Sequence, residues 1–267
     1  TVDHSKPVAS YVSGMLEQAG LPLPVTHTAF QVQHACAGGT LSLLTVAALL
    51  AAGGDAGECG LAVCTDIARY IPGSTGEITQ GAGAAALLVE QDPALVVLDL
   101  HSAGYASRDV DDFFRPVGSD EARVKGQYSI RCYRSALNEA FEDHCRRAGS
   151  SPARVLEAAD YFVLHVPYYS LPLDSMRMLL KKHLDMDADA ADAFLEERGF
   201  QESIAPARRI GNLYSGSMYM SLQELLVRQH ARLGEKITGK KILFASYGSG
   251  NTMVVFSGTV APRAPGV

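Results

Sequence analysis

Short apolar segments alternate with helical segments along most of the chain, and this alternation restricts the fold more than any other feature of the sequence. Apolar runs predict four strands in the first half, over 29–33, 61–65, 83–90 and 95–98. An alanine- and leucine-rich helix over 41–52 follows the first of these strands and ends at two glycines. Strands separated by helices are typical of a layered α/β fold.

The pattern starts again after the turn residues 149–152, so we expect a first half over 1–152 and a second half over 153–267. The elements expected from residue 129 onward are helices over 129–147, 175–184, 185–197 and 211–229, a strand over 161–166, and a strand, glycine turn and strand over 240–260. The chain also starts at Thr1, without a methionine, and enters an amphipathic helix over 6–16 almost at once. We therefore expect it to be a piece of a longer polypeptide.

The composition argues against several classes of partner. The 267 residues carry 23 Lys and Arg against 29 Asp and Glu, a formal net charge of −6, which does not attract nucleic acid or anionic membranes. The longest apolar run, 43–52, is about half the roughly 20 residues that cross a bilayer. No basic start leads into an apolar signal segment. These features predict a soluble, cytoplasmic protein.

Five cysteines form neither a disulfide framework nor a zinc motif, because their number is odd and none lies in a CxxC pair or near suitably spaced histidines. Among the five cysteines, Cys36, in the segment HACAGGT, is the one whose sequence context suggests a chemical role. It lies between a predicted strand and the first turn of a buried helix, where unpaired amides lower a thiol pKa and hold an oxyanion. Core packing of a small apolar thiol explains the same position equally well.

His165 ends the apolar strand YFVLH, where a strand-to-helix junction would expose it at a sheet edge. A cysteine and a distant histidine at two strand ends form a plausible nucleophile and acid/base pair, although a structural histidine is the commoner outcome. For His34 we expect a structural role and not a catalytic one. Three glycine loops, 79–84, 209–214 and 246–250, are weak signals when taken alone. The last of them fits neither a dinucleotide fingerprint nor a hydrolase elbow, and we expect it to bring backbone close to a ligand.

Nine segments, taken in order, resemble the 3-hydroxy-3-methylglutaryl-CoA synthase family. They are DHSKPVASYV, HACAGGT, CTDIARY, GEITQGAGAAALLV, DFFRP, VKGQYSIRCY, HVPYY, RIGNLYSGSMY and SYGSG. The resemblance covers nearly the whole chain. It implies a thiolase-like αβαβα fold of two similar halves, here without the family's N-terminal and C-terminal segments, and a homodimer.

The resemblance also implies roles for single residues. Cys36 matches the nucleophile that takes an acetyl group from acetyl-CoA, and His165 matches the histidine that handles the acetoacetyl thioester. The residues that match the family's substrate contacts are Asn212, the hydroxyls of Thr79 and Ser129, and the loop residues Tyr247, Gly248 and Ser249. Asp3, Asp66 and Asp112 match acidic residues near the family's site, with local ordering as an equal alternative. No metal and no resident cofactor is implied, because CoA thioesters are the substrates.

Two departures from the family keep other functions open. The family's catalytic glutamate would lie two residues before Thr1, outside this sequence. Ser170 and Asp174 stand where the family has a lysine suited to CoA phosphates, although Arg177, Lys181 and Lys182 could compensate. The mevalonate-type reaction is favoured by the DFFRP and VKGQYSIRCY segments. The alternatives are a polyketide β-branching synthase that acts on an acyl carrier protein, a ketoacyl-ACP synthase, and a noncatalytic remnant.

Overall fold

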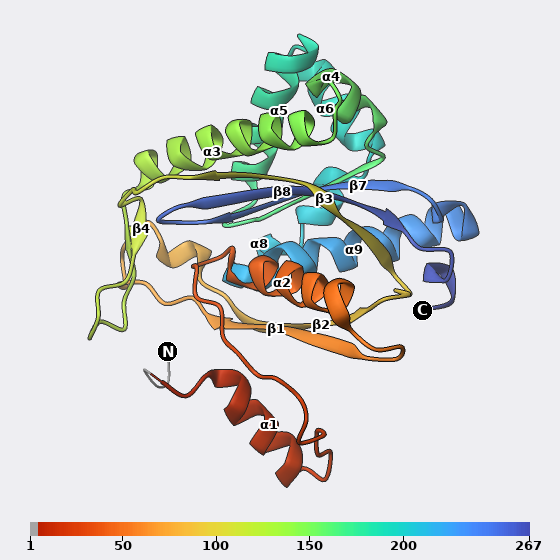
Figure 1. Ribbon diagram of the computed structural model, residues 1–267. Helices are drawn as coiled ribbons and strands as arrows, with labels where there is room; N and C mark the ends of the chain where they lie inside the picture. Colours follow the sequence, from red (N-terminus) through yellow and green to blue (C-terminus); the bar gives the residue numbers. More distant parts are fainter. Residues whose placement is uncertain (1–4) are drawn as a thin grey trace. The chain divides into compact units, whose positions relative to one another are not determined.

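The computed structural model describes residues 5–267, which form two units, one ending at Gln33 and one over His34–Val267 (Figure 1). Asp3 lies outside the described residues. In the first unit, α1 (Val8–Gln18) begins after Pro7 and ends before Gly20, whose φ of 78° is left-handed. The expected strand over 29–33 is wrong, since these residues form a loop. A strand needs a neighbour for its backbone hydrogen bonds, and this segment pairs with none.

The second unit contains the remaining elements. Its helices are α2 (Gly38–Gly53), α3 (Gly126–Arg147), α4 (Pro152–Ala158), α5 (Ser170–Leu184), α6 (Ala188–Glu197), α7 (Phe200–Ile204), α8 (Ala207–Ile210) and α9 (Ser217–Leu233). Its strands are β1 (Cys59–Ile67), β2 (Ala82–Glu90), β3 (Val96–Ser107), β4 (Phe113–Phe114), β5 (Arg123–Val124), β6 (Tyr161–Leu164), β7 (Lys241–Gly248) and β8 (Thr252–Val260). Almost every predicted element of this unit is therefore present, most with longer bounds.

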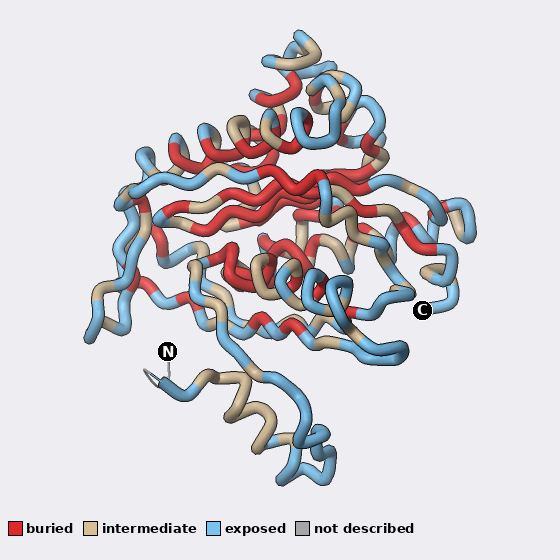
Figure 2. Tube along the Cα trace, viewed as in Figure 1, coloured by how far each residue is buried: buried red, intermediate tan, exposed pale blue. Residues whose placement is uncertain are grey.

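A four-stranded sheet in the order β3-β8-β7-β6 forms the centre of this unit. The helix α3 covers one face, and α2 and α9 lie along the other, with the antiparallel pair β1–β2 beyond α2 (Figure 1). Burial is concentrated in this sheet and in the helix faces turned toward it (Figure 2). Along β7, Leu243 and Ala245 pack into one core cluster, whereas Ile242 and Phe244 pack into the other. The alternation of a strand thus supplies side chains to both helical layers.

The sheet does not divide at the expected boundary between residues 152 and 153. Strand β3, from the first half, pairs antiparallel with β8, from the second, with partners such as Val96 and Val260. The register shifts between Asp99 and Gly104. The turn residues 149–152 connect α3 to α4 and do not separate two sheets. The strand β3, which precedes them, forms its hydrogen bonds with β8, which follows them.

One helical stretch among the described residues, Ala35–Gly53, is long and apolar enough by length and composition to cross a membrane. The sequence estimate, based on 43–52, was too short because the small residues of the first turn continue the helix. The core helix of a globular protein meets the same criterion. Leu43 and Ala47 of α2 are buried in the cluster beneath the central sheet.

The outward face of β1 and β2 is apolar and exposed. Leu61 lies opposite Leu88, and Val63 opposite Ala86, and these four side chains face away from α2. Leu61 and Leu88 are 53% and 61% exposed. The neighbouring Ile67 is exposed as well. A continuous apolar ladder of this kind is uncommon on the surface of a monomeric protein.

Gly104 allows β3 and α3 to approach closely. A Cβ at this position would lie 2.2 Å from the His144 nitrogen and 2.4 Å from the Ala140 oxygen, both in the α3 backbone. We expect Gly104→Ala to lower the free energy of unfolding by roughly 1–3 kcal/mol, because the helix must move away from the sheet. Gly126→Ala is the control, since nothing lies within 4 Å of its added Cβ. Denaturant unfolding of both variants checks this, and equal stabilities would contradict it.

Candidate functional site

Cys36 lies in a tight turn two residues before α2 begins. Ala35 holds a φ of 41°, which is unusual for a residue with a side chain. The turn is closed by the Ala37 amide, which donates to the His34 oxygen at 3.0 Å, and by the Gly38 amide, which donates to the Ala35 oxygen at 3.1 Å. The Cys36 residue is buried, with 8% of its surface exposed. Cys36 therefore lies in a strained turn that precedes α2, and not in the regular helix itself.

The electrostatics of Cys36 differ from the sequence expectation. Burial raises the pKa of the Cys36 thiol well above its ordinary value, and the negative charges of Asp66 and Asp112 raise it further. The expected lowering of this pKa by the helix N-terminus is therefore wrong for the free protein, because the loss of hydration and the two carboxylates outweigh the helix end. In this state Cys36 is a thiol at neutral pH.

Asp112 organises the turn between β7 and β8. Its carboxylate is fully buried and accepts hydrogen bonds from the Tyr247 hydroxyl at 2.7 Å and from the Gly250 amide at 2.9 Å. The Ser129 hydroxyl donates to the same carboxylate at 3.3 Å. Burial raises the pKa of the Tyr247 hydroxyl, so it stays protonated and remains a donor. Asp112 thus fixes the glycine loop through two hydrogen bonds and connects it to Ser129 of α3 through a third.

Gly248 joins this loop to the Cys36 turn. A Cβ on Gly248 would lie 2.5 Å from the His34 oxygen and 2.8 Å from the Ala37 nitrogen. Only a glycine allows β7 to end so close to the turn. The contact also places the loop beside the Cys36 turn.

His165 follows the last residue of β6 and is buried, with 2% of its surface exposed. Its amide donates to the Ala245 oxygen at 2.8 Å, and its carbonyl accepts from the Tyr133 hydroxyl at 2.9 Å. The expectation that it is exposed at a sheet edge is wrong, because the strand end is covered. Burial lowers the pKa of His165 to about 3, so the imidazole is neutral. Its Nδ1 is buried and has no hydrogen-bond partner among residues 5–267.

The parallel pairing of β6 and β7 brings His165 to the same sheet edge as the glycine loop. Parallel strands end at one edge, and the register aligns Leu164 with Ala245, three residues before Gly248. The rings of Tyr133 and Tyr247 are 5.1 Å apart, which links the residue that holds His165 to the loop. The Cys36 turn and the His165 strand end therefore contact one common segment.

Asn212 lies where two of the glycine loops meet. Its amide donates to the Thr79 oxygen at 2.9 Å. Its side-chain oxygen accepts from the Tyr214 amide at 2.8 Å and from the Ser217 hydroxyl at 3.0 Å. Gly211 has a φ of 83° and no room for a side chain, since a Cβ would lie 1.8 Å from the Gln80 oxygen. The side chain of Asn212 thus shapes the loop that precedes α9.

Known proteins with similar sequences support the family resemblance. The model of the hydroxymethylglutaryl-coenzyme A synthase C-terminal region matches residues 96–192 and 173–266, which together are more than half of the chain. The chain belongs to the hydroxymethylglutaryl-CoA synthase family. The hydroxymethylglutaryl-CoA synthase of Haloferax volcanii is 30% identical over 286 residues, which cover 93% of this chain and 63% of that protein.

Solved structures of this family have the same fold. MvaS in complex with 3-hydroxy-3-methylglutaryl coenzyme A is 38% identical, with a TM-score of 0.85, over 99% of this chain and 65% of that one. The HMG synthase of the curacin biosynthetic pathway, in complex with holo donor-ACP, is 25% identical with a TM-score of 0.88, over 100% and 62%. The thiolase-like fold expected from the sequence is confirmed. The chain spans less than two thirds of the length of each of these relatives.

The remaining family positions have local roles that the structure shows. The Thr79 hydroxyl donates to the Gly76 oxygen at 2.7 Å within a short 3-10 helix, and Ser249 is half-buried in the β7–β8 turn. Substrate contacts of Thr79, Ser129 and Ser249 stay predictions. Asp66, at the end of β1, accepts from the Ser215 hydroxyl at 3.1 Å, which favours an ordering role. Burial raises the pKa of Asp66.

Two tyrosines near Cys36 were missed by the sequence analysis. Burial raises the pKa of both Tyr70 and Tyr214. Phe113 packs edge-on between them, with ring centroids 6.1 Å and 6.0 Å away. They lie in the segments CTDIARY and RIGNLY, so the family resemblance contained the signal. A tyrosine in a loop carries no chemistry by spacing alone.

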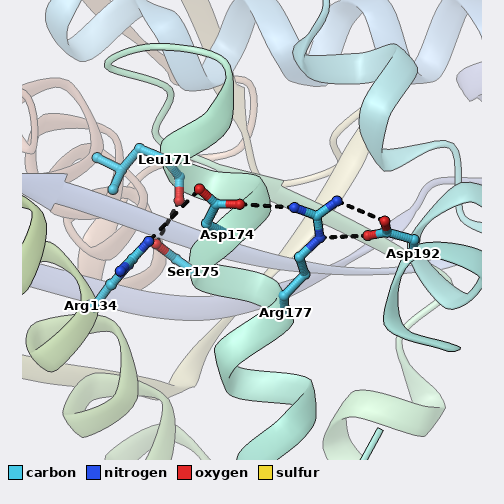
Figure 3. A network of polar contacts seen from close by, with 6 residues as sticks. All are labelled: Arg134, Leu171, Asp174, Ser175, Arg177 and Asp192. Carbon is cyan, nitrogen blue, oxygen red and sulfur yellow. Dashed lines mark hydrogen bonds and ion pairs between the residues drawn. The ribbon is translucent and has the colours of Figure 1, made fainter. Parts of the chain in front are cut away.

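The basic residues expected to replace the family's lysine are engaged elsewhere. The Arg177 guanidinium contacts Asp192 at 2.6 Å and Asp174 at 2.9 Å (Figure 3). Lys181 pairs with Asp185 at 2.6 Å, and Lys182 with Glu142 at 2.7 Å. These ion pairs already neutralise the three cations. The compensation expected from the next helix is therefore not supported.

Alkylation tests the protonation state of Cys36. Near neutral pH we expect iodoacetamide to modify the exposed Cys59 well before the buried Cys36, since only the thiolate reacts. The rate at Cys36 should rise as the pH becomes strongly alkaline. Asp66→Asn should move that rise to lower pH, because it removes a negative charge that raises the pKa of Cys36. Peptide mass spectrometry measures both rates, and faster modification of Cys36 than of Cys59 at neutral pH would contradict the assignment.

The buried His165 predicts a pH dependence of stability. Its folded-state pKa of about 3 lies below the ordinary 6.5, so the unfolded chain binds more protons between these values. Stability should fall as the pH decreases from 6.5, by up to about 1.4 kcal/mol per pH unit. His165→Gln should make this slope shallower, whereas the exposed His101→Gln should not change it. Denaturant unfolding at several pH values provides the slope, and a His165→Gln slope equal to that of the unmodified protein would refute the prediction.

Proposed function

We propose that the protein to which this chain belongs condenses an acetyl group, carried on Cys36, with acetoacetyl-CoA to give 3-hydroxy-3-methylglutaryl-CoA. The observation that carries this proposal is the strained, buried Cys36 turn, packed against Gly248 in a chain of the hydroxymethylglutaryl-CoA synthase family. The enzyme is an acyltransferase in this proposal. MvaS, 38% identical, is similar over 99% of this chain and was solved with 3-hydroxy-3-methylglutaryl coenzyme A.

The first step is a thioester exchange. The sulfur of Cys36 attacks the carbonyl carbon of acetyl-CoA, the bond from that carbon to the CoA sulfur breaks, and the thiol proton goes to the departing CoA thiolate. The exchange is nearly balanced in energy, because one thioester replaces another. The raised pKa of Cys36 requires that the proton leaves as the carbon–sulfur bond forms. A protonated thiol is also protected from side reactions until substrate arrives.

The second step makes the carbon–carbon bond. A base removes a proton from the methyl group of acetyl-Cys36, and in this proposal backbone amides at the α2 N-terminus stabilise the enolate oxygen. We assign this base to the family's glutamate, which matches a position outside this sequence. The enolate attacks the ketone carbon of acetoacetyl-CoA, an acid protonates the new alkoxide, and water hydrolyses the thioester to free Cys36.

His165 and Asn212 position the acceptor in this proposal. The Nδ1 of His165 is buried and has no hydrogen-bond partner among residues 5–267, so the neutral imidazole can form a hydrogen bond with the acetoacetyl thioester without adding charge. In this proposal Asn212 and the Tyr247–Ser249 loop also contact the acceptor. No resident cofactor takes part. We also propose a cytoplasmic homodimer, by analogy with the family.

The acetyl adduct tests the proposal. Incubation of the whole gene product with acetyl-CoA should add one acetyl mass to the peptide that contains Cys36. Cys36→Ala should abolish the adduct, and Cys59→Ala, which removes an exposed thiol, should retain it. An adduct that persists in Cys36→Ala, or no adduct in the unmodified protein, would exclude Cys36 as the acetyl carrier.

A carrier-protein acceptor is the second candidate. Ser170 and Asp174 replace the family's lysine, and the three neighbouring cations are ion-paired, which removes an obvious contact for CoA phosphates. The curacin HMG synthase, at 25% identity, was solved with a donor acyl carrier protein. Competition between acetoacetyl-CoA and an acetoacetyl carrier protein decides between the two. Decarboxylation of malonyl-ACP would instead indicate a ketoacyl-ACP synthase, and absence of all three reactions a noncatalytic protein.

A further inference from the structure

Arg208 connects the segments that carry two of the candidate site residues. It lies in α8, four residues before Asn212, and its guanidinium carbon is 3.5 Å from the ring centroid of Tyr169. Tyr169 lies four residues after His165 and directly precedes α5. A guanidinium stacked on a tyrosine keeps its full charge, while the ring limits the positions that it can take. Arg208 is therefore an oriented cation next to both segments.

The charge of Arg208 is not neutralised within its own unit. Among residues 34–267, no carboxylate lies within ion-pair distance of it, and its side chain is exposed. The cations of α5 contrast with Arg208, since Arg177, Lys181 and Lys182 each contact a carboxylate. The adjacent Arg209 is also exposed and has no carboxylate within ion-pair distance among residues 34–267, whereas the chain as a whole has a net charge of −6. Such a cation is available to an anionic ligand.

The N-terminus of α5 adds to the positive potential at this point. This helix has 15 residues and no acidic residue in its first turn, and Tyr169 occupies the capping position without a side-chain cap. A helix end is a weak anion site by itself. Here it stands beside an arginine that a ring from the same segment holds in place.

We propose that Arg208 binds a phosphate ester of the thioester substrate, at the far end of the pantetheine arm from the reacting sulfur, and that Tyr169 positions it. This inference rests on the proposed function, because only a CoA or phosphopantetheine thioester would carry a phosphate into this site. Arg208 thereby supplies the phosphate contact that the ion-paired cations of α5 do not. It discriminates for phosphorylated pantetheine thioesters and takes no part in bond making.

Binding measurements test this assignment. Dissociation constants for acetoacetyl-CoA, acetoacetyl-phosphopantetheine and acetoacetyl-pantetheine, which lacks phosphate, are measured by calorimetry in the whole gene product with Cys36→Ala to prevent turnover. Arg208→Ala should weaken acetoacetyl-CoA roughly tenfold or more and leave acetoacetyl-pantetheine unchanged. Arg154→Ala on α4, another exposed arginine without an ion pair among residues 34–267, should change neither.

Conservative variants separate positioning from folding. Tyr169→Phe keeps the ring and should bind acetoacetyl-CoA normally, whereas Tyr169→Ala should lose part of the affinity, and Arg208→Lys should be intermediate because an ammonium stacks less well. In the protein with Cys36 intact, Arg208→Ala should raise KM for acetoacetyl-CoA with little change in kcat. Loss confined to CoA places the contact at its nucleotide phosphates, and loss with phosphopantetheine as well places it at the phosphate that carrier proteins share.

Two results would overturn the inference. One is unchanged affinity of Arg208→Ala for both phosphorylated ligands, and the other is equal weakening of acetoacetyl-pantetheine, which would show a structural role. The proposed function is judged separately, by acetylation of Cys36. If Arg208→Ala is acetylated by acetyl-pantetheine at the normal rate, the reacting centre is intact and only the phosphate contact has been removed.

Discussion

The contact of Gly248 with the Cys36 turn is the constraint on which the arrangement of this site depends. Two segments more than 200 residues apart in the sequence meet there, at distances that exclude any Cβ. Because close packing transmits small displacements, a side chain at this position would move the turn, the β7–β8 loop, or both. The Asp112 carboxylate holds the loop from the other side through the Tyr247 hydroxyl and the Gly250 amide. The position of Cys36 is thus fixed by neighbours that do not themselves react.

Burial determines the charge state of the two principal residues. It raises the pKa of the Cys36 thiol and lowers that of the His165 imidazole, so both are neutral in the free protein. A thiolate and imidazolium pair, as found in cysteine proteases, is not the resting state here. Water-poor surroundings of this kind strengthen each later hydrogen bond to a substrate oxygen. The site therefore favours chemistry in which charge develops only after the substrate has displaced water.

Local sequence patterns predicted most of the second unit, because its strands and helices have clear apolar periodicity. The strand expected over 29–33 failed because its composition was suitable but no neighbouring strand was available. The central sheet contains strands from both sides of the expected boundary at 152, since the pairing of β3 with β8 is a long-range choice that turn residues do not encode. Cys36 and His165 were identified by position, but their burial and protonation were not, as both depend on the residues packed around them. The stacking of Arg208 on Tyr169 joins residues that no spacing rule connects.

The ladder of Leu61, Val63, Ile67 and Leu88 on β1 and β2 has a consequence for handling the protein. A two-stranded hydrocarbon surface of this kind attracts the same surface of other molecules, and it does so most strongly during refolding at high concentration. Turbidity and fluorescent dye uptake should therefore depend on this hairpin rather than on the central sheet. Charged replacements at Leu61 or Leu88 would improve colloidal behaviour without touching the interior, since both side chains point away from α2.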